Sequence, residues 1–241
     1  MDERDTRIVL ENSADPLTTQ DAVRTVIETP EGRKVDFSVV LGDITKVDAD
    51  AIVLPANPGF EFVPGGTLGA VAREAGMEVF DEAREKADEF LMLNGGMRYR
   101  DSDERGAPLG HTILTGVGRL QRPKAIIHVN NMHTDVTKPE GCDEEAVRVS
   151  AENVMRAAEE AGNIRSIAFP AIGTGLWGME LDASLKATIE GIRNHYTQNP
   201  ESEIQKTSVV IYAQASRPNA VQMRSLLFNK VYPSLQNPPQ K

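Results

Sequence analysis

The chain has 241 residues, of which 40% are hydrophobic and 26% charged, so it can bury a sizeable core and has the ordinary composition of a globular protein. Its net charge of −10 argues against a general nucleic-acid binder, because such proteins present a basic stripe that neutralises phosphates. A small anionic ligand is not excluded, since backbone N–H groups at a helix N-terminus bind phosphates without lysine or arginine.

The start of the chain and its single cysteine give two further expectations. Residues 2–5 are charged, and no window reaches the roughly 18 apolar residues of a membrane span, so we expect a cytoplasmic protein with no membrane partner. Cys142 is the only cysteine, which excludes an internal disulfide. It stands among loop-forming residues without a cysteine-enzyme signature, and we interpret it as an unreactive thiol.

The first predicted element is a β-hairpin. Residues 24–28 and 35–41 are strand-like runs on either side of a turn that contains proline and glycine. We therefore expect residues 1–35 to form an N-terminal extension that contributes one strand of this hairpin. Residues 231–241, which include three prolines, are expected to be a loosely held tail.

Beyond the hairpin, strand-like and helical patterns alternate. Apolar, β-branched runs predict buried strands at residues 51–54, 112–115, 125–129, 166–169 and 208–212. Helical periodicity falls between most of them, which predicts an α/β fold whose sheet is covered on both faces. We find no internal repeat and no linker long enough to divide the chain.

Two helices are recognisable from apolar residues spaced alternately by four and three. The first ends before Gly162, which suits a C-terminal cap, and contains Val147, Ala151, Val154, Ala158 and Ala161. The second is predicted to begin at Asp182 as its N-cap and to end before Asn199-Pro200. Its apolar residues are Leu185, Ile189, Ile192 and Tyr196.

A first pair of glycines stands where a short helix is predicted to begin. Gly65-Gly66-Thr67 precedes the apolar spacing of Leu68, Val71, Ala72 and Ala75, and the pattern ends near Gly76. Glycine lets a backbone approach a phosphate closely, and the first N–H groups of a helix have no partner within the helix. The alternative is a tight turn without a ligand.

A second glycine loop, residues 173–178, follows the strand predicted at 166–169. It satisfies the G-x-G-x-x-G pattern, which in a dinucleotide fold opens a helix directly and precedes an acidic residue about 20 positions further on. Here residues 179–181 intervene, and Pro170 interrupts the end of the strand. A complete dinucleotide-binding unit therefore fits poorly.

Two polar residues follow predicted strands. Asp43 can accept a hydrogen bond from an amino group such as that of adenine, and Asn57 can hold sugar hydroxyls. Each has a simpler interpretation, as a capping aspartate and a turn asparagine. Tyr212 can flank a base or can be a buried strand tyrosine.

Together these segments resemble the macro-domain family in order and spacing. The resemblance covers about residues 36–214 and rests on four blocks, residues 42–45, 50–57, 65–70 and 169–175. It implies a three-layer α/β/α sandwich with a mixed, mostly parallel central sheet over residues 36–230. It also implies binding of ADP-ribose, or of an ADP-ribosylated protein, at the strand ends, without a cofactor.

The resemblance implies a role for each candidate residue. Asp43 would meet the adenine amino group, Ile44 would line its pocket, and Asn57 would face the distal ribose as the catalytic residue. Trp177 would cover that ribose, the alternative being a core anchor. The diphosphate would be held by Gly65, Gly66, Thr67, Gly173, Thr174, Gly175, Leu176 and Trp177.

Two departures from the family pattern bear on catalysis. The usual Asn-Ala-Ala-Asn is Leu54-Pro55-Ala56-Asn57 here, and Leu68 stands where human-type hydrolases carry an aspartate. A hydrolase would have to rely on Asn57, the phosphate of the substrate and a positioned water. Glu61 is an alternative acid, although we favour its interpretation as a solvated loop glutamate.

Two functions stay open: hydrolysis of mono-ADP-ribosyl or O-acetyl-ADP-ribose linkages, and non-catalytic reading of ADP-ribose or a related nucleotide. We expect no metal site, because the odd separation of His128 and His133 points their side chains to opposite faces of a strand. The polar insertion at residues 94–106 is a flexible rim or a specificity loop.

Overall fold

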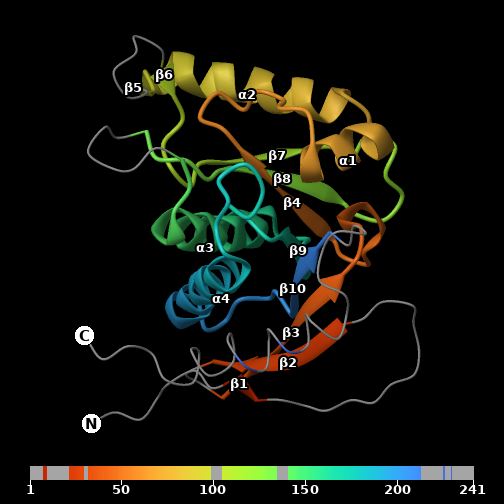
Figure 1. Ribbon diagram of the computed structural model, residues 1–241. Helices are drawn as coiled ribbons and strands as arrows, with labels where there is room; N and C mark the ends of the chain where they lie inside the picture. The colour runs from red at the N-terminus through yellow and green to blue at the C-terminus, as the bar shows by residue number, and fades with distance from the viewer. Residues whose placement is uncertain are drawn as a thin grey trace.

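An eight-stranded sheet runs through the middle of the molecule (Figure 1). The computed structural model describes residues 8–9, 22–29, 32–98, 105–134 and 141–212, with the single positions 225 and 229. The strand order is β1-β2-β3-β10-β9-β4-β8-β7. The strands are β1 (Ile8–Val9), β2 (Ala22–Glu28), β3 (Lys34–Leu41), β4 (Ala51–Ala56), β7 (Thr112–Thr115), β8 (Ala125–Asn130), β9 (Ser166–Pro170) and β10 (Lys206–Ile211).

The centre of the sheet is parallel and its margins are antiparallel. β3, β10, β9, β4 and β8 form consecutive parallel pairs. β1, β2 and β7 join their neighbours in the antiparallel sense. Parallel strands lie between two helical layers, which explains why apolar residues run continuously through β4, where Ala51, Ile52, Val53 and Leu54 are all buried. The predicted hairpin and strands are confirmed, but β7 is not fully buried, because its residues alternate between buried and half-buried.

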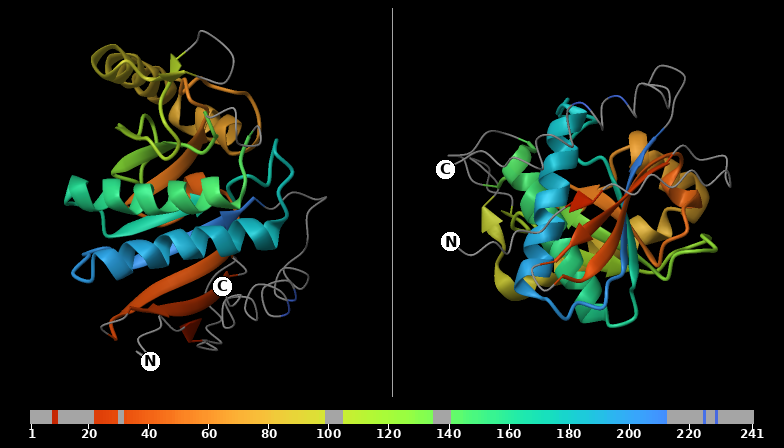
Figure 2. Two further views of the ribbon diagram at one scale, coloured as in Figure 1. Left: turned by 90° about the vertical axis from the view of Figure 1, so that its left-hand side faces the viewer. Right: turned by 90° about the horizontal axis from the view of Figure 1, so that it is seen from below.

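Helices cover both faces of the sheet. α3 (Glu144–Ala161) and α4 (Leu181–Gln198) bury one large apolar cluster against it. Figure 2 shows these two helices side by side in front of the strands. α1 (Gly66–Ala75) and the start of α2 (Glu78–Asn94) bury a second cluster on the opposite face. The prediction of a three-layer α/β/α sandwich is confirmed.

The helix ends agree with the sequence at one helix and differ at another. The C-cap of α3 is Gly162, as predicted, and its φ of 72° lies in the left-handed region. The prediction that Asp182 caps α4 is wrong, because the N-cap is Glu180 and Asp182 lies in the first turn. Negative side chains are favoured throughout the first turn of a helix, so an acidic residue there does not define the cap.

The segments outside the central sheet are only partly described. Residues 97–98 and 105–106 of the polar insertion pair as the antiparallel strands β5 (Met97–Arg98) and β6 (Arg105–Gly106). β2 extends the sheet beyond the expected boundary at residue 36, and the three-part division at residues 35 and 230 stays a prediction. The expected tail, 231–241, lies outside the described residues. Among the described residues no helix is long and apolar enough to cross a membrane.

Candidate functional site

The candidate residues follow the carboxyl ends of neighbouring parallel strands. Asp43 follows β3, Tyr212 follows β10, the glycine loop 173–178 follows β9, and Asn57 follows β4. In the sheet these strands are adjacent in the order β3, β10, β9, β4. Residues distant in sequence are thereby arranged along one edge, with Asp43 at one end, the glycine loop between, and Asn57 at the other. Ligands of open α/β sheets bind at this edge.

The first glycine pair forms the N-terminus of α1, as predicted. Gly65 is the N-cap with φ 118°, and Gly66 opens the helix with φ 50°. Both values lie where a side chain is strained, so glycine is needed for this turn. Gly65 and Gly66 are exposed, and their surroundings are open in the described structure. Helical N–H groups at this terminus are available to an anion.

The second glycine loop, residues 173–178, is held by hydrogen bonds to residues directly before and after it. The Thr174 Oγ1 hydroxyl donates to the Ala171 carbonyl at 2.8 Å, and the Met179 N–H donates to the Gly173 carbonyl at 3.1 Å. The side chain of Leu176 is 84% exposed. α4 begins at Leu181 rather than at the loop, which agrees with the rejection of a dinucleotide-binding unit. Among described residues no hydrogen bond joins the two glycine segments.

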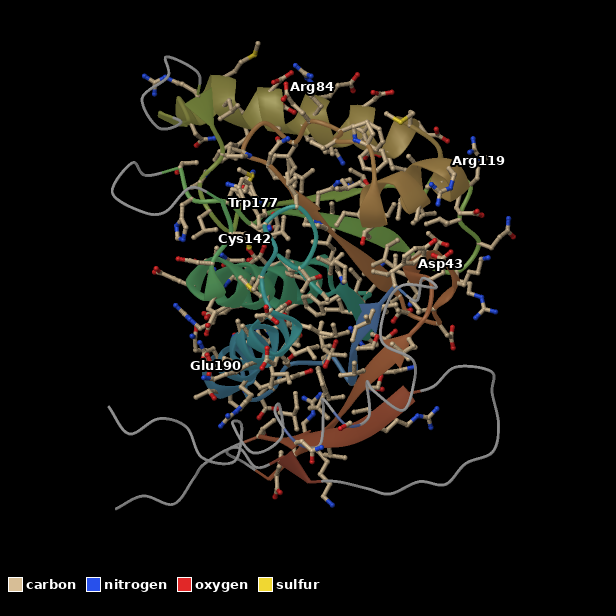
Figure 3. The ribbon with its side chains drawn as sticks, viewed as in Figure 1. Asp43, Arg84, Arg119, Cys142, Trp177 and Glu190 are labelled. Atoms are coloured by element: carbon tan, nitrogen blue, oxygen red, sulfur yellow. The ribbon has the colours of Figure 1, made fainter. Side chains whose placement is uncertain are left out.

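Trp177 rests on the chain just before α3. A Cβ added to Gly141 would lie 2.3 Å from Trp177 Cε3, so the indole ring contacts this glycine closely. Trp177 is half-buried, which agrees in part with the core-anchor interpretation. Figure 3 shows Trp177 beside Cys142, with Asp43 well removed from both.

Cys142 lies under the second glycine loop. A Cβ on Gly173 would be 3.4 Å from its Sγ, and Asn131, which follows β8, hydrogen-bonds the thiol. Burial raises the pKa of Cys142 to about 11, which keeps the thiol protonated at neutral pH. Sequence reasoning did not connect Asn131 or Gly141 with the site, because only tertiary packing brings them there.

Asp43 adopts the capping role that was its simpler interpretation. Its Oδ1 accepts hydrogen bonds from the Thr45 backbone N–H at 3.0 Å and from Thr45 Oγ1 at 2.7 Å, at the start of the 3-10 helix η1 (Ile44–Lys46). These bonds fix the carboxylate beside the sheet edge. Ile44 is buried in the apolar cluster that also contains Val71 and Val210. It therefore supports this turn from within the core.

Asn57 braces the loop that follows β4. Its Oδ1 accepts from the backbone N–H groups of Gly59 and Glu61, each at 3.0 Å, and its Nδ2 donates to the Glu61 carbonyl at 3.2 Å. These bonds are those of a turn asparagine, which was the simpler interpretation of Asn57. An amide nitrogen carries two N–H groups, so one donor remains beyond the contact with Glu61.

The loop 57–61 packs against α2 and against the polar insertion. Phe60 is 2% exposed with φ 54°, a value rarely seen for a large side chain. Its ring contacts that of His111 edge to face, with centroids 5.9 Å apart. The Ala107 N–H donates to the Pro58 carbonyl at 2.8 Å, and a Cβ on Gly106 would lie 2.5 Å from that of Pro58. The insertion therefore reaches the loop that holds Asn57.

Glu61 is a charged side chain in the loop that follows β4. Glu61 points its carboxylate toward Arg84 on α2, with Oε1 and Nη1 3.4 Å apart and both side chains more than half exposed. His128 and His133 have separate partners. His128 Nε2 lies 3.1 Å from Thr115 Oγ1, and His133 Nε2 lies 2.8 Å from Asp143 Oδ1.

The fold and this edge define an α/β domain with two glycine segments at its strand ends. The profile of the Macro domain family matches residues 55–188, and the chain belongs to this family.

Relatives and solved structures agree with this membership. An uncharacterised protein from Pyrobaculum aerophilum is 34% identical over 159 residues, 66% of this chain and 75% of that protein. An O-acetyl-ADP-ribose deacetylase from Enterobacter sp. is 29% identical over 170 residues, 70% of this chain and 84% of the relative. The Oceanobacillus iheyensis macrodomain with ADP matches at TM-score 0.60 and 22% identity, covering 82% of this chain and 91% of that chain. The last similarity shows the fold.

Proposed function

We propose that the protein binds ADP-ribose along the carboxyl edge of its sheet. The observation that carries this proposal is the order Asp43, glycine loop 173–178, Asn57 across adjacent strands. β3 and β4 are three strand spacings apart, a span of about 14 Å. That span suits a ligand with a base at one end, a diphosphate in the middle and a sugar at the other end.

The middle of this edge offers backbone groups rather than side-chain charge. None of the proposed contacts at residues 43–44, 57, 65–67 and 173–177 is lysine or arginine. Glycines at 65, 66 and 173 have positive φ, and the amides at the start of α1 lack helical partners. Oriented N–H groups of this kind bind phosphates. The names of the deacetylase relative and of the ADP-bound macrodomain support a ligand of this class.

For catalysis we propose hydrolysis of a mono-ADP-ribosyl or O-acetyl-ADP-ribose linkage. The oxygen of a bound water forms a bond to the anomeric carbon of the distal ribose, or to the ester carbonyl carbon. The bond to the leaving group breaks and its electron pair stays with the leaving group, while a proton of the water passes to a substrate phosphate oxygen and from there to the leaving group. Asn57 holds a ribose hydroxyl through its remaining amide N–H and orients the sugar, because an amide cannot act as a base.

A non-catalytic reader is the second candidate, and Leu54 and Leu68 favour it. Leu54 is fully buried, and Leu68 packs against the apolar cluster under α1. Neither side chain can orient water or accept a proton. A reader keeps the same ligand contacts without turnover.

Calorimetric titration of the purified chain with ADP-ribose, with ADP and NAD as comparison ligands, tests the proposal. We expect micromolar binding of ADP-ribose that falls about tenfold in Asp43→Ala, since a hydrogen bond to a charged group is worth about 1.5 kcal/mol or more. Asp48→Ala is the matched control, because Asp48 is an exposed carboxylate two residues beyond η1. Absence of ADP-ribose binding overturns the proposal.

Gly175→Val tests the role of the second glycine loop. Nothing lies within 4 Å of a Cβ at Gly175, so the free protein should tolerate the side chain, whereas a diphosphate approaching the backbone would meet it. Gly116→Val, at the end of β7, is the control, because β7 is antiparallel to β8 and ends at the opposite edge of the sheet. Equal affinity in the two variants would remove the loop from the ligand site.

A further inference from the structure

A second group of polar side chains lies at the start of α3. His133, Asp143 and Glu145 each direct one potential ligand atom toward the others, and these atoms all lie within 4.8 Å of one another. His133 follows β8, whereas Asp143 is the N-cap of α3 and Glu145 lies in its first turn. The protein therefore brings an imidazole from one element to two carboxylates of another.

The imidazole is held in place for this contact. His133 is 5% exposed, its Nε2 lies 2.8 Å from Asp143 Oδ1, and its backbone N–H donates to the Gly141 carbonyl at 3.2 Å. Asp143 Oδ1 also accepts from the Ala146 N–H at 2.9 Å, which orients the carboxylate at the helix start. Of the three side chains only His133 is buried, and its orientation and that of Asp143 are fixed by hydrogen bonds, as is typical of metal ligands.

We propose that His133, Asp143 and Glu145 bind a divalent transition-metal ion of the zinc type. One imidazole nitrogen and two carboxylate oxygens are ligands that Zn²⁺ accepts at separations of a few ångströms, and three protein ligands leave a position for water. The nitrogen ligand favours Zn²⁺ over Mg²⁺ and Ca²⁺, which prefer oxygen.

Two other potential ligands near the start of α3 and on β8 have different contacts. The thiol of Cys142 is directed toward Gly173 and Asn131, so it lies outside the ligand set. His128 contacts Thr115 and Phe80 instead. The expectation of no metal rested on the pair His128 and His133 alone. The carboxylates near His133 come from α3, whose N-cap Asp143 lies ten residues further along the chain.

The ion would link the end of β8 to the start of α3. Its ligands flank this connection, whose ends already meet through the His133 N–H and the Gly141 carbonyl. Gly141 in turn contacts the ring of Trp177. Closing a loop with a metal removes conformational freedom from the unfolded chain, so Zn²⁺ should stabilise the folded protein.

Titration of the intact protein with Zn²⁺ after removal of metals by a chelator tests the site, with Mg²⁺ and Ca²⁺ as further arms. We expect one Zn²⁺ per chain, a higher midpoint of thermal unfolding with Zn²⁺, and much weaker binding of the other two ions. Glu145→Gln should lower the Zn²⁺ affinity at least about tenfold, and His133→Asn should lower it further. Glu145 is exposed, so its variant should fold even if the His133 variant does not.

Glu144→Gln is the matched control, because Glu144 is an exposed carboxylate in the same helical turn but outside the group of three. The proposal is overturned if Zn²⁺ does not bind saturably. It is equally overturned if Glu144→Gln weakens binding as much as Glu145→Gln, because the ion would then be an adventitious one held by surface charge.

Discussion

At the scale of single residues, Asn57 combines a structural with a proposed binding role. Its carbonyl oxygen accepts two backbone hydrogen bonds, whereas its amide makes one contact and keeps one donor. Truncation to alanine would remove both roles together. A variant that separates them is therefore more informative than Asn57→Ala alone.

Asn57→Asp is that variant. It keeps an oxygen that accepts from Gly59 and Glu61 but has no amide donor, so we expect a free energy of unfolding within about 1 kcal/mol of wild type and a clear loss of turnover. Asn57→Ala should in addition lose about 1 kcal/mol of stability, because the N–H groups of Gly59, part-buried, and Glu61, exposed, lose their acceptor. Urea unfolding and single-turnover hydrolysis measure the two effects. Full turnover in Asn57→Asp would contradict the proposed role of the amide.

Glu61 provides a second test at this scale. Its carboxylate faces Arg84, and an ion pair with both side chains more than half exposed contributes at most about 1 kcal/mol. We expect Glu61→Gln to leave both stability and turnover near wild type, with Arg84→Gln as the control for the ion pair. A large loss of turnover in Glu61→Gln alone would instead identify Glu61 as the acid missing at Leu68.

At the scale of elements, local patterns predicted most of the central strands and the helices α1, α3 and α4. Their apolar spacing and terminal glycines are properties of short segments, and Gly65, Gly66 and Gly162 do have positive φ. No local pattern predicts α2 individually. Its buried residues Val79, Phe80, Ala83 and Ala87 include two alanines, which give a weak apolar signal.

The residues of the candidate site were predictable from the resemblance to the macro-domain family. The tertiary contacts that position them were not. The contacts of Gly141 with Trp177, and of the loop 57–61 with the insertion, join residues more than thirty positions apart. No local pattern contains such contacts. The capping bond of Asp43 and the turn of Asn57 were foreseen as alternatives, because they depend on neighbours within four residues.

The junction between the insertion and the loop 57–61 can be tested with Gly106→Val. A Cβ there would lie 2.5 Å from the Cβ of Pro58, so the loop that carries Asn57 must move. We expect a loss of about 1–3 kcal/mol in the free energy of unfolding, together with weaker ADP-ribose binding. At Gly116 a Cβ would meet only the flexible Glu82 side chain at 3.5 Å, so Gly116→Val should be mild. Unchanged affinity in Gly106→Val would separate the insertion from the site.

At the scale of the whole molecule, the two edges of the parallel sheet differ. At the amino edge, Asp50 accepts from Lys124 Nζ at 2.8 Å and from the Arg165 N–H at 2.8 Å, which joins the starts of β4, β8 and β9. Burial opposes ionisation of this carboxyl, but these hydrogen bonds lower its pKa below the ordinary value. The carboxyl edge carries exposed glycines instead. The amino edge is thus joined by a carboxylate, whereas the carboxyl edge presents backbone groups to a ligand.

The pH dependence of stability follows from a histidine inside this sandwich. Burial lowers the pKa of His128 to about 4, with Glu82 opposing and Lys86 adding to the shift, whereas an unfolded histidine titrates near 6.5. Between these values the unfolded chain binds more protons than the folded one, so the contribution is complete above pH 6.5 and is lost as the pH falls toward 4. The loss is about 3 kcal/mol for this residue. The pKa of His195 is lowered in the same direction by burial.

Urea unfolding of the wild type and of His128→Gln at pH 7.5, 6 and 5 measures this contribution. Glutamine can still hydrogen-bond Thr115 but does not titrate, so the variant should lose less stability on acidification than the wild type, whatever its stability at pH 7.5. His195 remains in both proteins, so its share cancels in the comparison. Equal acid sensitivity of the two proteins would mean that His128 is already accessible to protons in the folded state. The acid-sensitive element would then have to be sought at His195, whose partners Glu159 and Ser202 tie α3 and α4 to the segment before β10.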